Sequence, residues 1–180
     1  MPSAKERIGS EIPACRVGRF ATIYADPPWR FDGCSGQGGP AYKGCFRYNT
    51  LPDSSILAMP VEGMARINAH LYLWVVNSRI DFGLRVMEAW GFRYRTQLVW
   101  GKVRRDGQVL RGMGNFFRSS HELCLFGTRG KAPTLKPGRT QPTVLHAQRR
   151  EHSRKPDEFY EIIERCSPGP RLELFARYPR

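Results

Sequence analysis

The chain has 180 residues, enough for one domain with a hydrophobic core but too few for two. Its composition, 41% hydrophobic and 12% aromatic, excludes an intrinsically disordered chain. The 29 lysines and arginines against 16 acids give a net charge of +13, which favours nucleic acid as the partner over an anionic membrane surface. We expect one domain over residues 1–180, with residues 1–18 as a loosely ordered segment.

Neither membrane insertion nor a zinc site is indicated. No apolar run is long enough to span a bilayer, and the N-terminal MPSAKERIGSEIPAC lacks the apolar core of a signal peptide. The five cysteines are widely spaced and form no Cys-x-x-Cys pair. We expect a cytoplasmic protein with reduced thiols, no membrane partner and no metal.

The first half of the chain alternates short apolar runs with turn signals. FATIYA (20–25) predicts a buried strand, which Asp26-Pro27-Pro28 ends because proline fixes φ and lacks an amide hydrogen. Residues 32–45 are rich in glycine without periodicity and predict a mobile loop. Within 48–59, Asp53 stands in an N-cap position before apolar residues, which predicts a short helix.

A strand, a helix and another strand follow in order. HLYLWVV (70–76) is too short for a helix and predicts a buried strand. Residues 80–90 carry apolar side chains at helical spacing, and FRYRTQLVWGK (92–102) alternates as a strand does. This βαβ order predicts parallel pairing of 70–76 with 92–102 through a right-handed crossover.

The second half holds the clearest helix of the chain. Residues 154–170 have Pro156 at the start, acids in the first turn and one apolar face. The other elements are basic loops at 103–120 and 129–142 and strands at 121–128, 143–147 and 171–178. The sum is an α/β fold with a mostly parallel sheet and helices on both faces.

The turn after the first strand carries the chemistry. In a parallel sheet, ligands bind beyond the carboxyl ends of the strands, where Asp26 stands. Its carboxylate and the carbonyl of Pro27 can accept from the two N–H groups of a planar amine, while Trp29 can stack on or wall in an aromatic ring. Acceptors aimed at an exocyclic amine of a nucleobase favour its attack on an electrophile in the transition state.

These residues carry a family resemblance. DPPW (26–29) resembles the signature of methyltransferases that act on the 6-amino group of adenine. LYLWVVNS, AWGFRYRTQLVWGK, HELCLFGTRG and REHSRKPDEFYEIIERCSPGPRLELFAR, in that order, resemble the branch with the eukaryotic messenger-RNA adenosine methyltransferase and its bacterial and phage relatives. The resemblance covers roughly residues 20 to 178.

The resemblance implies a Rossmann-like fold that binds S-adenosyl-L-methionine, releases S-adenosylhomocysteine and needs no metal. It implies that Asp26, Pro27, Pro28 and Trp29 form the catalytic turn, with Asp26 also near the cofactor. Tyr48 matches an aromatic residue near the substrate base, a core position being the alternative. Lys155 matches the residue that holds the methionine carboxylate, or else only begins a helix. Cofactor contacts are further implied at Glu173, Leu174 and Arg177.

The basic loops predict the nucleic-acid surface. Their arginines and lysines, with Phe116 and Phe117 nearby, fit a groove that follows phosphates, although a solvated surface is the alternative. His121 and Glu122 begin a strand near the expected base, where a structural role is also open. The substrate-binding candidates are Tyr48, Lys102, Arg104, Arg105, Arg118, His121 and Glu122.

The hypothesis is therefore S-adenosylmethionine-dependent methylation of the 6-amino group of adenine, with DNA favoured over RNA. A base in a duplex is inaccessible, so the adenine would be flipped or taken unpaired. The resemblance to bacterial and phage proteins places the expected chain in the cytoplasm of a bacterial or phage-infected cell, as a possible homo- or heterodimer. The alternatives are a non-catalytic nucleic-acid-binding subunit with this fold, and methylation of a protein or small-molecule amine.

Overall fold

The described residues form one six-stranded sheet with the strand order β5-β3-β4-β2-β1-β6. The computed structural model describes residues 18–30, 50–112, 114, 116–151 and 154–176. The strands are β1 (Phe20–Ala25), β2 (Ala65–Val75), β3 (Arg93–Val103), β4 (His121–Arg129), β5 (Val144–Gln148) and β6 (Arg171–Leu174). Each predicted strand is present, although β2 begins earlier and β6 ends earlier than expected.

The sheet is mixed. β1 pairs in parallel with β2 and β6, and β3 pairs in parallel with β5. β4 is antiparallel to both of its neighbours, β2 and β3. The predicted direct pairing of 70–76 with 92–102 is therefore wrong. The chain returns from β3 through a hairpin, and β4 takes the place beside β2 that the βαβ rule assigned to β3.

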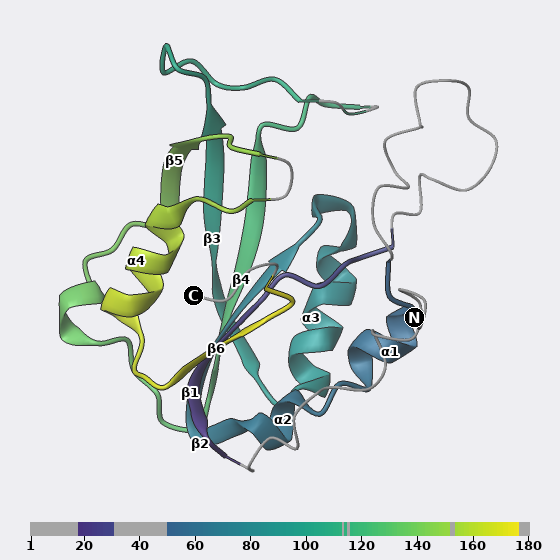
Figure 1. Cartoon of the computed structure of the whole chain (residues 1–180), viewed down its shortest axis with the longest axis vertical. Helices are drawn as coiled ribbons and strands as arrows, with labels where there is room; N and C mark the ends of the chain where they lie inside the picture. Colours follow the sequence, from purple (N-terminus) through teal and green to yellow (C-terminus); the bar gives the residue numbers. More distant parts are fainter. Residues whose placement is uncertain (1–17, 31–49, 113, 115, 152–153, 177–180) are drawn as a thin grey trace, which may run out of the picture.

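Helices cover both faces of the sheet, as predicted (Figure 1). Successive strand residues point to opposite faces. Leu71 and Leu73 of β2 therefore join the core beneath α3 (Ile80–Ala89), whereas Tyr72 and Trp74 join the core beneath α4 (Asp157–Cys166). The two faces thus hold separate hydrophobic cores, one mainly aliphatic and one mainly aromatic.

The short helices begin where proline or an acid stands in the sequence. α1 (Asp53–Leu57) and α2 (Val61–Met64) lie on the α3 side, and two 3-10 turns span Asn77–Arg79 and Lys136–Gly138. Pro156 caps α4 as predicted. The prediction for Asp53 is wrong, because Pro52 is the cap of α1 and the carboxylate of Asp53 instead forms a bidentate pair with Arg79.

Within the described part of the chain, no helix has the length and apolar character needed to cross a bilayer. The predicted loop at 32–45 and almost all of the predicted segment 1–18 lie outside the described residues.

The carboxyl ends of the parallel strands and the start of β4 lie along the same edge of the sheet, which runs across the strands. The end of β1 lies beside the end of β6, where Ala25 pairs with Leu174, and the end of β3 lies beside the end of β5, where Val103 pairs with Gln148. Because β4 is antiparallel, its first residue, His121, pairs with Gly101 near the same edge. Segments from residue 26 to residue 174 therefore meet there.

A buried histidine ties β2 to the segment after α4. His70 is fully buried; its Nε2 lies 2.7 Å from the carbonyl of Ala132 and its Nδ1 lies 2.7 Å from the hydroxyl of Ser167. Because a carbonyl only accepts, Nε2 carries the hydrogen and Nδ1 accepts from Ser167, whose oxygen accepts from Tyr72 at 2.7 Å. The neutral ring is therefore fully hydrogen-bonded.

We expect this histidine to make the fold sensitive to acid. Burial lowers the pKa of His70 below its ordinary value, and the hydrogen bond to Ala132 only partly offsets this effect. The unfolded chain takes up the proton near pH ~6.5 while the folded chain does not, so the free energy of unfolding should fall as the pH drops below that value. His70→Gln should be less stable at pH 7.5 by about 1–3 kcal/mol, with a flatter profile from pH 7 to 5, in urea denaturation. If the free energy of unfolding falls equally with pH in the wild type and in His70→Gln, His70 is not the source of the acid sensitivity.

Candidate active site

The turn after β1 is held from several sides. The Pro27 carbonyl accepts the amide of Trp29 at 2.9 Å, and the Pro28 carbonyl accepts the amide of Leu51 at 3.0 Å. Arg79, whose guanidinium pairs with Asp53, also donates to the carbonyl of Arg30 at 3.0 Å. The two prolines stiffen the turn, and these bonds fix its place at the end of β1.

Trp29 anchors this turn in the core. The side chain is 4% exposed, packs edge-on against Phe82 at 5.8 Å between ring centroids, and donates from Nε1 to the carbonyl of Trp74 at 2.9 Å. A ring enclosed in this way offers little surface for stacking, and in the structure the residue positions the turn. That Trp29 walls in a substrate ring stays a prediction.

Asp26 lies at the end of a chain of four alternating charges. Its Oδ2 is 3.1 Å from Nζ of Lys155, which is 2.8 Å from Oε2 of Glu122. The other oxygen of Glu122, Oε1, is 2.7 Å from Nζ of Lys102. We call Asp26, Lys155, Glu122 and Lys102 the charge chain. It joins the ends of β1 and β3, the start of β4 and the segment before α4.

The members of the charge chain stabilise one another's ionised forms. Burial alone would lower the pKa of Lys155, but Asp26 and then Glu122 more than offset it, so this pKa lies above its ordinary value. Burial would likewise raise the pKa of Glu122, yet Lys155 and Lys102 hold it below its ordinary value. Nζ of Lys155 also lies 4.6 Å from the ring centroid of Trp74. The side chains of Asp26 and Glu122, 33% and 31% exposed, are the parts of this arrangement that a ligand can reach most easily.

The predicted cofactor residues lie at the end of β6. Glu173 pairs with Tyr24 and Leu174 with Ala25, so both stand beside the catalytic turn. Oε1 of Glu173 accepts from the hydroxyl of Tyr160 at 2.8 Å. The next residue, Phe175, has a φ of 68°, a left-handed conformation that a non-glycine side chain adopts only at some cost. The backbone therefore turns sharply just where β6 reaches the site.

The donor set of this edge fits S-adenosylmethionine. A carboxylate at a strand end, Glu173, can accept from ribose hydroxyls, and an ammonium group before a helix, Lys155, can meet a carboxylate. Lys155 already contacts two protein carboxylates, so a cofactor carboxylate would share Nζ with Asp26 and Glu122. Its predicted role in cofactor binding stays a prediction. Tyr48 and Arg177 lie outside the described residues.

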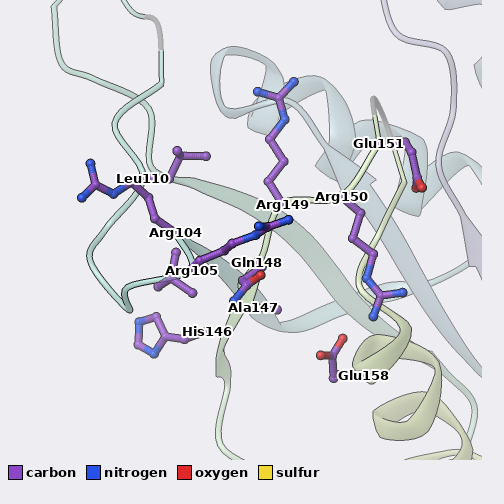
Figure 2. Close-up of a pocket in the computed structure, with 11 residues that line it drawn as sticks. Arg104, Arg105, Leu110, His146, Ala147, Gln148, Arg149, Arg150, Glu151 and Glu158 are labelled. Atoms are coloured by element: carbon purple, nitrogen blue, oxygen red, sulfur yellow. The ribbon is translucent and has the colours of Figure 1, made fainter.

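A cavity of about 830 Å³ opens between the ends of β3 and β5 and the start of α4 (Figure 2). Four arginines line it, against the two acids Glu151 and Glu158. The arginines are Arg104, Arg105, Arg149 and Arg150. We call this cavity the basic pocket; its excess of arginines suits phosphate groups.

The four arginines differ in their partners. Arg104 pairs with Asp106, and Arg150 pairs with Asp157. Figure 2 shows the side chain of Arg150 directed toward Glu158, whereas the side chain of Arg149 extends in the opposite direction, away from Glu158. Within the described part of the chain, Arg105 and Arg149 make no salt bridge, which leaves their guanidinium groups to solvent or to a ligand.

The other predicted substrate residues divide between two places. Lys102 and Glu122 belong to the charge chain, and His121 lies beside it, with Nε2 3.2 Å from Nδ2 of Asn77. Arg118 is exposed on the segment that joins β3 to β4, which extends beyond the sheet in Figure 1. The structure thus brings Asp26, Lys102, Glu122 and Lys155 together, whereas Arg118 makes no salt bridge to them within the described residues.

Sequence reasoning missed the residues that support the site from the core. Trp74 donates from Nε1 to the hydroxyl of Tyr24 at 2.7 Å, and Tyr24 packs edge-on against Tyr160 at 5.2 Å between centroids. Arg79 was also missed. The sequence did offer a signal. An indole N–H, a hydroxyl or a guanidinium on a buried strand or at a helix start usually needs a hydrogen-bond partner.

In the part of the chain that the structure describes, no three histidine, cysteine or acidic side chains gather as a metal site would require.

Comparison with known proteins gives a consistent picture. The family model described as MT-A70 matches residues 20–180. The N(6)-adenosine-methyltransferase MT-A70-like protein of Drosophila melanogaster is 32% identical over 164 residues, 89% of this chain and 25% of that protein. The N(6)-adenosine-methyltransferase catalytic subunit METTL3 of Homo sapiens is 30% identical over 164 residues, 89% of this chain and 26% of its own length.

A relative of more similar length also matches. The type II methyltransferase M.MunI of Mycoplasma sp. is 27% identical over 175 residues, which are 88% of this chain and 72% of that protein. By contrast, the chain spans about a quarter of the length of the METTL3-like relatives. What is common to all of them is therefore the domain that carries the site described above.

We expect Glu122→Gln to destabilise the protein, because Lys155 and Lys102 each lose an ionised partner. The loss in free energy of unfolding at pH 7 should be about 1–3 kcal/mol. Since the pKa of Glu122 is lowered on folding, its contribution is present above the unfolded value near pH ~4.5 and is lost as the pH falls through the lowered folded value. The gap between variant and wild type, measured by urea denaturation, should therefore narrow in acid.

Glu88→Gln is the matched control, because Glu88 is exposed on α3 and belongs to no charge chain. Its free energy of unfolding should stay within about 0.5 kcal/mol of the wild type. Equal losses for Glu88→Gln and Glu122→Gln would show that the charge chain adds nothing to stability.

Proposed function

The chain belongs to the MT-A70 family, and we propose that it transfers a methyl group from S-adenosylmethionine to the 6-amino group of adenine in nucleic acid. One observation carries the proposal: a rigid turn presents the partly exposed Asp26 carboxylate beside Lys155, at the edge where β1 and β6 end together. The names of the relatives, which include N(6)-adenosine-methyltransferases, support the reaction.

Asp26 is proposed to orient the adenine amine. Its carboxylate accepts an N–H, and the Pro27 carbonyl, which uses one lone pair for Trp29, has a second lone pair for the other N–H. Both bonds strengthen as the nitrogen gives its lone pair to the methyl carbon, so they favour the transition state over the ground state. The carboxylate keeps its place because Lys155 holds it.

Bound S-adenosylmethionine would supply a methyl group on a positively charged sulfur, which keeps the electron pair of the broken bond as the neutral thioether of S-adenosylhomocysteine. The amine nitrogen forms the new bond to carbon and then loses one proton. Asp26, with a third of its side chain exposed, leaves that proton a path to solvent. The work left to the protein is mainly the alignment of amine and methyl group.

We propose DNA ahead of RNA as the substrate. In either case the target adenine is unpaired or is flipped out of a duplex. The +13 charge and the basic pocket support an anionic polymer. The similarity to a type II methyltransferase, 27% identical over 175 residues, supports the order of preference.

The test is transfer of label from methyl-labelled S-adenosylmethionine to oligonucleotides of DNA and of RNA, followed by identification of the labelled base. We expect label on the 6-amino group of adenine, and none on oligonucleotides without adenine. Absence of label despite measurable binding of cofactor and oligonucleotide would overturn the proposed reaction and favour a non-catalytic binding subunit.

We expect Asp26→Ala to lower the rate of transfer by about a hundredfold or more, because an acceptor that acts in the transition state is lost. Oligonucleotide affinity, measured by fluorescence anisotropy, should change little. Asp81→Asn, an exposed change on α3, is the matched control and should keep full activity. Transfer that survives Asp26→Ala would remove Asp26 from the mechanism.

We expect Arg105→Ala and Arg149→Ala each to weaken oligonucleotide binding and to reduce the slope of log affinity against log salt by about 0.7–0.9, as one phosphate contact does. Arg66→Ala is the control, because Arg66 is exposed near the start of β2, at the opposite edge of the sheet. Unchanged slopes for the two pocket variants would take the basic pocket out of the binding surface.

A further inference from the structure

Two neighbouring aromatic side chains stand in solvent on the segment between β3 and β4. Phe116 is 95% exposed and Phe117 is 90% exposed, and the next most exposed large apolar side chain of the described residues, Ile67, is 78% exposed and stands alone. Single exposed apolar residues are ordinary on protein surfaces. Two adjacent rings with almost no intramolecular contact, by contrast, indicate a surface that a partner covers.

Backbone hydrogen bonds hold the described residues on either side of the two rings. The amide of Leu110 donates to the carbonyl of Lys102 at 2.8 Å, and the amide of Gly112 donates to the carbonyl of Ser119 at 2.8 Å. A β-carbon on Gly112 would collide with that same carbonyl oxygen, and one on Gly114 would collide with the carbonyl oxygen of Phe117. Gly112 and Gly114 therefore allow the backbone before and after the two rings to approach closely.

The charge around the rings selects the class of partner. Residues 107–120 include Arg111 and Arg118 and no acid, and Arg118 follows Phe117 directly. Near the start of this segment, Arg105 lines the basic pocket and makes no salt bridge within the described residues. Flat rings among arginines complement the flat bases and the phosphates of a nucleic acid, whereas an apolar protein surface would not need the arginines.

We propose that Phe116 and Phe117 stack on unpaired bases of the bound nucleic acid. Aromatic rings hold any base, since every base has a π-face, so this contact adds affinity without reading sequence. The inference rests on the proposed function for its choice of nucleic acid, but it concerns binding and not transfer.

The test measures binding of single-stranded oligonucleotides that carry 2-aminopurine at successive positions, with anisotropy for affinity and 2-aminopurine emission for stacking. Phe116→Leu/Phe117→Leu keeps apolar side chains but removes the rings. We expect it to lower affinity roughly five- to a hundredfold, to abolish a position-specific quenching of emission, and to leave the salt slope unchanged. Phe116→Trp/Phe117→Trp should retain both affinity and quenching.

Two matched variants separate stacking from charge and from general surface effects. Arg118→Ala should reduce the salt slope by about one while keeping the quenching, since it removes a phosphate contact and no ring. Ile67→Ala, the exposed apolar residue near the start of β2, should change neither quantity. Thermal melting of each variant checks that the fold is intact, as the rings have almost no contacts to lose.

Two outcomes would overturn the inference. Unchanged oligonucleotide affinity in the leucine variant would do so directly. Light scattering supplies the second outcome. If the wild type is a dimer, and Phe116→Leu/Phe117→Leu is a monomer with unchanged oligonucleotide affinity, the rings belong to a contact with a second copy of the chain. Both measurements need no turnover, so a wild type that binds oligonucleotides without methylating them would refute the proposed function and leave the stacking result to stand by itself.

Discussion

The site depends on the salt bridges that join Asp26 to Lys155 and Lys155 to Glu122. A carboxylate meant to accept hydrogen bonds from an amine must stay ionised and stay in place, and one ammonium group secures both. That group, however, lies in a mostly buried position above the ring of Trp74, where a single counter-charge would hold it less firmly. Glu122 supplies the second counter-charge, and Lys102 completes a chain of two acids and two lysines.

This arrangement explains why the direction of β4 matters. In a wholly parallel sheet, the first residue of a strand would lie at the edge opposite the catalytic turn. Because β4 is antiparallel, its second residue, Glu122, pairs with Trp100 and lies near the end of β3, at the edge where β1 also ends. The one feature of the sheet that the sequence rules assigned wrongly is therefore the feature that delivers the central carboxylate of the charge chain.

The elements and the catalytic turn could be predicted from the sequence because local rules determine them. Two prolines end β1 wherever the chain is placed, and apolar spacing marks α4 in any fold. The partners of Glu122 and the core position of Trp29 could not be predicted in this way. They depend on strand order and on which face a side chain takes, and both are decided by packing among residues far apart in the chain. Short motifs therefore indicated the candidate site, whereas the contacts that hold its side chains in place could be seen only in the three-dimensional structure.

The strand order also separates the two ligands that the proposed reaction needs. Glu173 and Leu174 stand on β6 at one end of the sheet, and the basic pocket lies across β3 and β5 at the other end. The charge chain runs between them, from Asp26 to Lys102, and its charges sum to zero. A cationic sulfur on one side and an anionic backbone on the other can thus approach the same turn without either being repelled by it. The proposed role of Asp26 therefore follows from its position between the end of β6 and the basic pocket.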